Sequence, residues 1–193
     1  GGGYTNSITE TLSGNEAEYS TIAGGREHVV RSSYSTVGGG YNHTISAYGS
    51  TIAGGVGNTI APPPAANPVN YSAIGGGQAN VISQSSAFLG GGYANVLDGY
   101  AGTIGGGFEN RLTGDYAVIA GGQGNFASGE HSAVLGGEGL WATGSHSVAL
   151  GGSNVEARGA FSFAAGRNAL ATDDNSFVWN SASYNFVTQG EQV

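Results

Sequence analysis

Two apolar positions recur along this chain at fixed distances from a pair of adjacent glycines. One lies two residues before the first glycine of each pair, and the other lies six residues after it. Copies that stack on one another would align each position into an apolar ladder. The first ladder would contain Ile22, Val37, Ile52, Ile74, Leu89, Ile104, Ile119, Val134 and Ala149. The second would contain Val30, Ile45, Ile60, Ile82, Leu97, Leu112, Ala127, Ala142 and Ala157.

The glycine pairs mark a regular repeat. From the first marker, Gly2, the successive spacings are 22, 15, 15, 22, 15, 15, 15, 15 and 15 residues. The two long spacings equal one repeat plus an insertion, which a solenoid accommodates as a loop. The later markers are predicted turn glycines: Gly24, Gly39, Gly54, Gly76, Gly91, Gly106, Gly121, Gly136 and Gly151.

The residues around the apolar positions favour strands. They are often β-branched or aromatic, as in Thr21-Ile22 and Phe126-Ala127, and each glycine inside a helix would cost about 1 kcal/mol. A repeat this short cannot bury its apolar side chains alone. We therefore predict an all-β solenoid, a parallel β-roll with turns of ~15 residues and two strands of about four residues per turn.

The repeat sets the predicted domain boundaries. Residues 1–171 form the β-roll domain, with loop insertions at about 9–19 and 61–70. The second insertion holds all four prolines, which cannot donate to a sheet, so we expect an extended surface loop. Residues 172–193 lose the repeat and are predicted to form a terminal strand followed by a cap or linker.

The apolar pattern shifts along the chain. Early copies such as residues 20–24 have one large apolar residue in the middle of the first strand, whereas residues 147–151 have large residues on either side of Ala149. We predict that the main apolar row changes face between about Tyr116 and Leu135. Between them, residues 117–120 are apolar on both faces. A strand apolar on both faces is usually covered on both, which predicts an oligomer.

Composition narrows the function classes. The chain of 193 residues has no lysine, five arginines and thirteen acidic residues, giving a net charge of -8. This charge argues against binding nucleic acid or an anionic membrane. The absence of cysteine rules out a disulfide or a reactive thiolate. No apolar run approaches the ~20 residues of a membrane span, so we expect no direct membrane insertion by this chain. Because it begins within a repeat, we expect it to be part of a longer chain.

Two segments resemble a known family. Residues 147–151 read Ser-Val-Ala-Leu-Gly and residues 161–166 read Phe-Ser-Phe-Ala-Ala-Gly. With the Ala-x-Gly turns, they resemble the head repeats of YadA-like trimeric autotransporter adhesins, although the regular period here is 15. The earlier copies, such as residues 34–42, resemble repeats of bacterial surface or phage tail-fibre-like proteins. The resemblance implies a left-handed, trimeric β-roll at a cell or virion surface, with a role in adhesion.

Candidate binding motifs mostly have structural explanations. Residues 122–127 match a dinucleotide-binding glycine pattern but lack a βαβ context. Residues 54–58 and 121–125 are similar to calcium-binding repeats, but have asparagine where those need aspartate. We interpret Asn58 and Asn125 as turn residues that tolerate left-handed backbone. His131 and His146 lie one repeat apart and should stack as turn residues, because two histidines alone are a weak metal site.

Other polar and aromatic rows suggest alternatives. Asp98 and Asp115 lack a nucleophile motif, and Asp173-Asp174 is interpreted as a turn. Thr21, Thr36 and Thr51 form a row that suggests ice binding, but the row continues as Ala73, Phe88, Thr103 and Val118. Tyr19, Tyr34 and Tyr71 could form an aromatic stripe for glycans or apolar partners; we expect them to cover turns.

We predict a non-enzymatic structural or adhesive module of an extracellular fibre or surface adhesin. Its partners would be copies of itself, with a host glycan or matrix protein as a further candidate. We expect no cofactor, metal site or nucleic acid. The first alternative is a phage tail-spike or fibre segment that binds or processes host glycans, with Glu109, Asp115 or Glu130 as candidate acids. The second is an ice-binding solenoid.

Overall fold

The computed structural model describes residues 3–9, 17–62, 70–181 and 186–188. Among them there are 23 strands and no helix, so none of these residues forms a helix that could cross a membrane. The predicted insertions at about 9–19 and 61–70 fall largely at residues 10–16 and 63–69, outside the described residues. The chain divides into two compact units, Gly1–Leu97 and Asp98–Val193, and each is described by itself.

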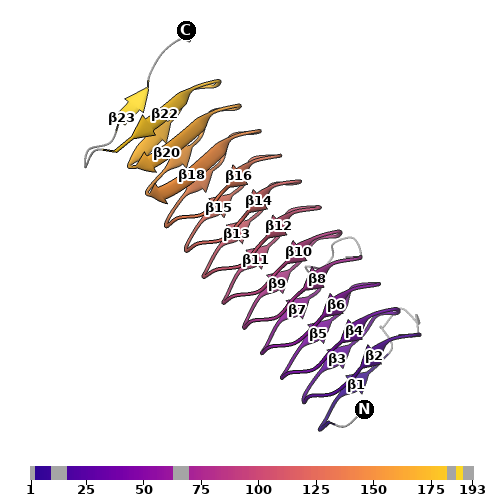
Figure 1. The fold of residues 1–193 in the computed structure, drawn as a ribbon. Coiled ribbons are helices and arrows are strands. Elements are labelled where there is room, and N and C mark those ends of the chain that lie inside the picture. Colours follow the sequence, from indigo (N-terminus) through magenta and orange to yellow (C-terminus); the bar gives the residue numbers. More distant parts are fainter. Residues whose placement is uncertain (1–2, 10–16, 63–69, 182–185, 189–193) are drawn as a thin grey trace. The chain divides into compact units, whose positions relative to one another are not determined.

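Unit 1 is a parallel β-solenoid in which each turn adds one strand to each of two sheets (Figure 1). Its odd-numbered sheet contains β1 (Ser7–Ile8), β3 (Val29–Val30), β5 (Thr44–Ile45), β7 (Thr59–Ile60), β9 (Val81–Ile82) and β11 (Val96–Leu97). Its even-numbered sheet contains β2 (Thr21–Ile22), β4 (Thr36–Val37), β6 (Thr51–Ile52), β8 (Ala73–Ile74) and β10 (Phe88–Leu89). Successive strands pair in parallel with equivalent residues aligned, as Val37 does with Ile52.

Unit 2 repeats this arrangement (Figure 1). Its even-numbered sheet contains β12 (Thr103–Ile104), β14 (Val118–Ile119), β16 (Ala133–Val134), β18 (Val148–Ser153), β20 (Phe163–Arg167) and β22 (Phe177–Asn180). Its odd-numbered sheet contains β13 (Arg111–Leu112), β15 (Phe126–Ala127), β17 (Trp141–Ala142), β19 (Glu156–Ala157), β21 (Ala169–Ala171) and β23 (Phe186–Thr188). Both sheets continue past residue 171, because β22 pairs with β20 and β23 with β21.

The all-β parallel solenoid predicted from the repeat is confirmed, but the strands are shorter than expected. Most contain two residues instead of four. Left-handed residues belong to the next corner a few residues after the buried position, as Gly40 does after Val37 and Gly49 after Ile45. Only β18, β20 and β22 in the even-numbered sheet extend to four residues or more.

The second residue of each short strand points into the core. The side chains at the first predicted apolar position are buried from Val37 onward, whereas Ile22 is half-buried. Those at the second position are buried from Val30 to Ala157. The buried residue keeps its place relative to the marker glycine in both units. The predicted change of face concerns the large apolar residues: the inward side chains become Ala149 and Ala164, while Leu135 and Trp179 are exposed.

A column of amides lines the inside of one corner. Asn58, Asn80 and Asn95 in unit 1, and Asn110 and Asn125 in unit 2, occupy the same place in their repeats and are buried. The Asn125 amide nitrogen donates to the carbonyls of Gly121 and Gly137, at 2.9 and 3.1 Å. Its oxygen accepts the backbone N–H of Leu140 in the next turn, at 2.9 Å. One side chain therefore satisfies two backbone groups that the corner leaves outside the strand ladders, the Gly121 carbonyl and the Leu140 N–H, and adds a second hydrogen bond to the Gly137 carbonyl, which also accepts the N–H of Gln123.

The same corner excludes any side chain at the second glycine of a pair. Gly122 has a φ of 95°, and a Cβ there would overlap the Gly137 carbonyl oxygen and lie 2.7 Å from the Asn125 amide nitrogen. At the marker itself, Gly121, a Cβ would meet only the Gly106 oxygen at 3.9 Å. The marker glycines repeat in the sequence, but the position that cannot accept a side chain is the glycine directly after each marker.

We predict that Gly122→Ala destabilises unit 2 by more than about 2 kcal/mol, from left-handed strain plus overlap with backbone. Gly121→Ala is the matched control and should cost less than about 1 kcal/mol. Urea unfolding of both variants measures the difference. Equal losses of stability would show that this corner does not pack as described.

We also predict that Asn125→Asp destabilises unit 2 by about 3 kcal/mol or more, because a carboxylate cannot donate and would face two carbonyl oxygens. Aspartate has nearly the same shape as asparagine, so the substitution leaves no cavity that would add to the loss of stability. Gln123→Glu adds the same charge at an exposed position two residues away and should change stability by less than about 0.5 kcal/mol. Similar urea midpoints for the two variants would contradict the amide column.

Candidate interaction surfaces

The outward positions beside the buried column of the even-numbered sheet in unit 2 carry no charge, and most of them are apolar; farther along β20, Arg167 is exposed. Strand alternation turns eleven residues outward: Thr103, Gly105, Val118, Ala120, Ala133, Leu135, Val148, Leu150, Phe163, Phe177 and Trp179. Leu135 is 51% exposed, Phe177 64% and Trp179 65%. The rings of Phe163 and Phe177 stack with centroids 4.9 Å apart. We call these eleven residues the even face of unit 2.

The corresponding face of unit 1 is also uncharged but built from smaller residues. It consists of Thr21, Ala23, Thr36, Gly38, Thr51, Ala53, Ala73, Gly75, Phe88 and Gly90. The three threonines of the predicted row are exposed and aligned by strand pairing. Ala73 follows them in register, so the hydroxyl row ends after three turns.

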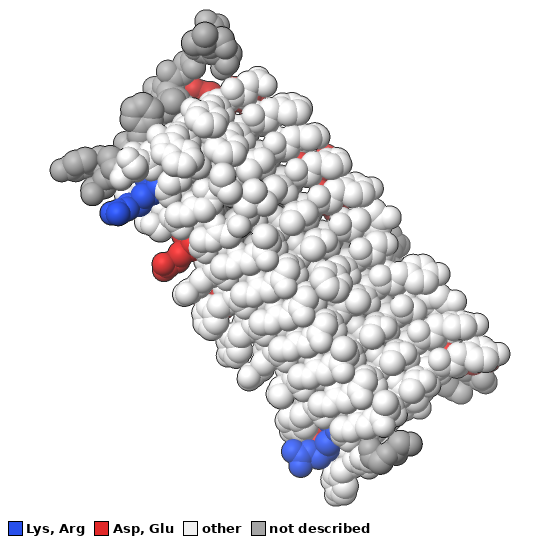
Figure 2. All heavy atoms as spheres, in the orientation of Figure 1, with Lys and Arg blue, Asp and Glu red and all other residues white. Residues whose placement is uncertain are grey.

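The odd-numbered sheet of unit 2 carries charge on its outer face. Arg111 lies 3.3 Å from Asp98, and Arg158 pairs with Glu156. Trp141 is exposed on the same sheet, and its ring meets Phe126 edge to face. Figure 2 shows one view of the molecule, in which most surface atoms belong to uncharged residues and the charged side chains lie near the margins. Exposed ion pairs contribute little to folding stability. Because the side chains of both pairs reach the solvent, we interpret this sheet as a solvated face.

Rings stack along the corner between the two sheets of each turn. In unit 2, Tyr116, His131, His146 and Phe161 stack at 4.8–5.0 Å with interplanar angles of 9–16°. In unit 1, Tyr19 stacks on Tyr34 at 5.0 Å. Tyr48 contacts Tyr34 and meets Tyr71 edge to face. Apart from Tyr48, these residues have a φ near 57°, so the predicted tyrosines and histidines lie on the turns themselves.

This geometry limits what the stacks can bind. In the unit 2 stack, each inner ring has neighbours on both faces, so mainly ring edges reach the solvent. The parallel rings of His131 and His146 direct their nitrogen lone pairs side by side instead of toward one point. Among the described residues, no group of three or more His, Cys, Asp or Glu side chains could hold a metal ion. His131 lies instead 3.6 Å from the Glu130 carboxylate.

The candidate acids lie on two different corners. Asp115 and Glu130 occupy the same position in consecutive turns, beside the ring stack, and Glu109 lies on the glycine corner. Asp115 accepts the backbone N–H of Tyr100 at 2.8 Å. Asp174 accepts that of Ala160 at 2.7 Å in the equivalent way. Asp98 pairs with Arg111. These contacts give Asp98, Asp115 and Asp174 structural partners, and the structure does not bring Glu109 onto the corner of the other two candidate acids.

The interpretation of Asn58 and Asn125 as left-handed turn residues is wrong. The left-handed residues are Gly57 and Gly124, directly before them, and both amides are buried in the column described above. The glycines of residues 54–58 and 121–125 therefore form a corner closed by an internal amide. Their carbonyls accept hydrogen bonds from the asparagines.

Sequence reasoning missed a second polar column at the opposite corner. In unit 1, Ser35 donates to the Ala47 carbonyl at 2.9 Å and lies 3.4 Å from the Ser50 nitrogen, from which it accepts. Ser72 accepts the N–H of Ala87 in the same way at 3.2 Å. These serines are buried and recur beside the apolar positions, so their regular spacing was the available signal. They belong to the core and not to a binding surface.

Comparison with protein-family models and with curated proteins gives no match to this chain.

Proposed function

We propose that this chain is a non-enzymatic structural and adhesive module of an extracellular fibre or surface adhesin, in which copies pack through their even faces. The observation that supports this proposal is the even face of unit 2, where eleven outward positions beside the buried column lack any charge. Large apolar side chains exposed together on one face mark an interaction site. The odd-numbered sheet, with its solvated ion pairs, would then face water.

The choice of a second copy as the partner rests on periodicity. Outward residues recur at every turn along the even face, in strict register. A partner with the same repeat can match this spacing over the length of the face, and a copy of the chain has that repeat. Three copies, a surface location and an adhesive role come from the resemblance to YadA-like head repeats. The outer face of the odd-numbered sheet would remain accessible to a host glycan or matrix protein.

The two alternatives have less support. A glycan-binding spike would use ring faces as platforms for sugars, whereas the unit 2 rings stack on each other. An ice-binding face would need a longer hydroxyl array than the one formed by Thr21, Thr36 and Thr51. Neither alternative accounts for the exposed leucine, phenylalanine and tryptophan on the even face.

We predict that the purified chain is a trimer by light scattering and that Leu135→Glu converts it to monomers. Burying three added carboxylates without partners is strongly unfavourable. Trp141→Glu is the matched control, because Trp141 is similarly exposed, at 46%, on the odd-numbered sheet of the same unit. It should leave the mass unchanged.

Circular dichroism of both variants checks that each keeps its strand content. A wild-type chain that remains a folded monomer at high concentration would contradict the proposal. Dissociation by Trp141→Glu and not by Leu135→Glu would place the interface on the other sheet.

A further inference from the structure

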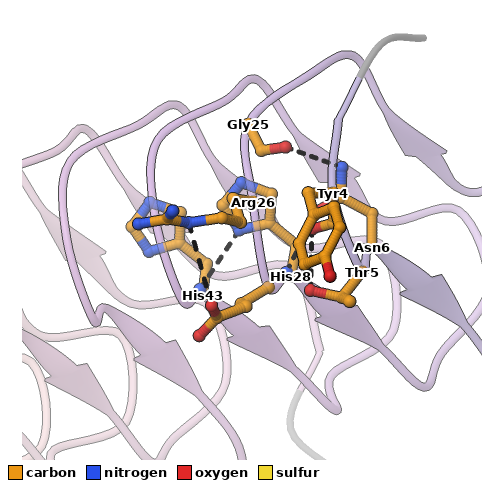
Figure 3. Close-up of polar contacts among 8 residues, drawn as sticks. Tyr4, Thr5, Asn6, Gly25, Arg26, His28 and His43 are labelled. Carbon is orange, nitrogen blue, oxygen red and sulfur yellow. Dashed lines mark hydrogen bonds and ion pairs between the residues drawn. The ribbon is translucent and has the colours of Figure 1, made fainter.

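Two buried histidines replace asparagines in the amide column of unit 1. His28 and His43 lie where later turns carry Asn58, Asn80 and Asn95, and both are 0% exposed. Figure 3 shows the two imidazoles side by side behind Arg26, with Asn6 on the preceding turn. Their ring centroids are 4.9 Å apart and their planes differ by 7°. The column in these turns therefore reads Asn6, His28, His43 and Asn58.

The imidazoles use one nitrogen as the asparagines use their oxygen. His28 Nδ1 accepts the backbone N–H of His43 at 3.2 Å, and His43 Nδ1 accepts that of Asn58 at 3.1 Å. An accepting Nδ1 places the single ring proton of each neutral imidazole on Nε2. Both Nε2 atoms are buried and make no hydrogen bond of ordinary geometry. They lie on the glycine side of the corner, toward Gly25 and Gly40 respectively.

Protonation would disrupt this arrangement in two ways. A second ring proton on Nδ1 would point at the N–H that it now accepts, so two hydrogen bonds between turns would become donor–donor contacts. Protonation of both rings would also place two positive charges on stacked rings inside the core. An asparagine in the same position has no proton to gain in this pH range and would be unaffected.

Among the described residues, no acidic side chain is a cause of the pKa shift of either ring. The charged or titratable groups at the glycine corner of the surrounding described turns are Tyr4, Arg26, Glu27 and Tyr41, and Glu18, Tyr19, Arg31, Tyr34 and Tyr48 lie elsewhere on those turns. Arg26 lies 3.7 Å from Glu27 and 4.8 Å from the centre of the Tyr41 ring, and the pKa of Tyr41 is raised mainly by its hydrogen bond to Glu27. Glu27 is thus engaged outside the corner. The neighbours above and below in the column are the neutral amides of Asn58 and Asn6.

From this geometry we propose that the His28–His43 pair is a pH-sensitive latch, which keeps the first turns of unit 1 closed near neutral pH and lets them open under mildly acidic conditions. The turns concerned carry β1 to β6. Unit 2 should not respond in this way, because its column at this corner contains Asn110, Asn125, Leu140 and Val155 and no histidine. The proposal does not depend on the oligomer or on adhesion.

The direction of the pH dependence follows from linkage. Burial lowers the pKa of His28 below 6.5, partly offset by the Gly40 backbone. The pKa of His43 is also lowered, mainly by burial and then by the charge of His28. The open turns therefore bind more protons than the closed turns. The stabilisation is fully present above about pH 6.5 and is lost as the pH falls toward the lowered pKa values.

Hydrogen exchange of the wild-type chain at about pH 7.5 and about pH 5.5 tests the latch. After correction for intrinsic exchange rates, each histidine neutral in the closed state should raise the opening constant by about 10-fold over this interval, and the pair by up to about 100-fold. We expect this loss of protection in the turns carrying β1 to β6 and not in unit 2. Equal pH dependence in the two units would overturn the proposal.

The matched control is the double variant His28→Asn/His43→Asn, which carries the residue of the later turns. It should keep its protection at both pH values, and each single variant should lose about half of the pH response on a logarithmic scale. An unchanged pH response in the double variant would overturn the proposal. Imidazole NMR of the wild type gives a readout without mutation. His28 and His43 should remain neutral with the proton on Nε2 over this pH interval, whereas ordinary titration of both rings would also overturn the proposal.

Discussion

The close approach of successive turns at the glycine corner is the constraint on which the rest of each unit depends. Stacked rings on adjacent turns lie 4.8–5.0 Å apart, close to the spacing of strands in a sheet. At this spacing, the second glycine of each pair faces the backbone of the next turn with no room for a Cβ. The corner then leaves backbone groups that water cannot reach, and the internal amides satisfy them.

The two units fill their interiors differently under this constraint. Unit 1 combines large aliphatic residues in both apolar columns with polar columns at both corners. In unit 2 the apolar columns end in alanines such as Ala142 and Ala157, while Leu140 and Val155 take over the place of the asparagines. As the inward residues become smaller, the outward ones become larger, as Leu135 and Trp179 show. Apolar surface thus moves from inside the turn to a face that another chain can cover.

The sequence predicted the fold because its signals were periodic. Glycine pairs and apolar residues recur every 15 residues, and parallel strands in register are the arrangement that buries such a repeat. The repeat also placed Ala149 in the first apolar ladder, although Val148 and Leu150 on either side of it are larger. The fixed register keeps this small residue inside. The asparagines and serines were visible as repeats, but burial of an amide depends on carbonyls from two turns.

The candidate surfaces were predictable only in part. The stacking of His131 on His146 follows from their spacing of one repeat, and the structure shows it. The left-handed backbone at Tyr34 or Tyr116 left no signal, because such residues rarely adopt it. The histidine pair was missed because His28 and His43 do not share a motif with the asparagines that they replace. Only the position in the turn relates them.

The most direct test of this account is side-chain amide exchange by NMR. If the amides of Asn58, Asn80 and Asn125 close the corners, their Nδ2 protons should exchange slowly, on the time scale of the neighbouring backbone amides. The exposed Asn42 and Asn175 should exchange at rates close to those of free peptides. Equally fast exchange at all five side chains would contradict the claim that internal amides hold the stacked turns together.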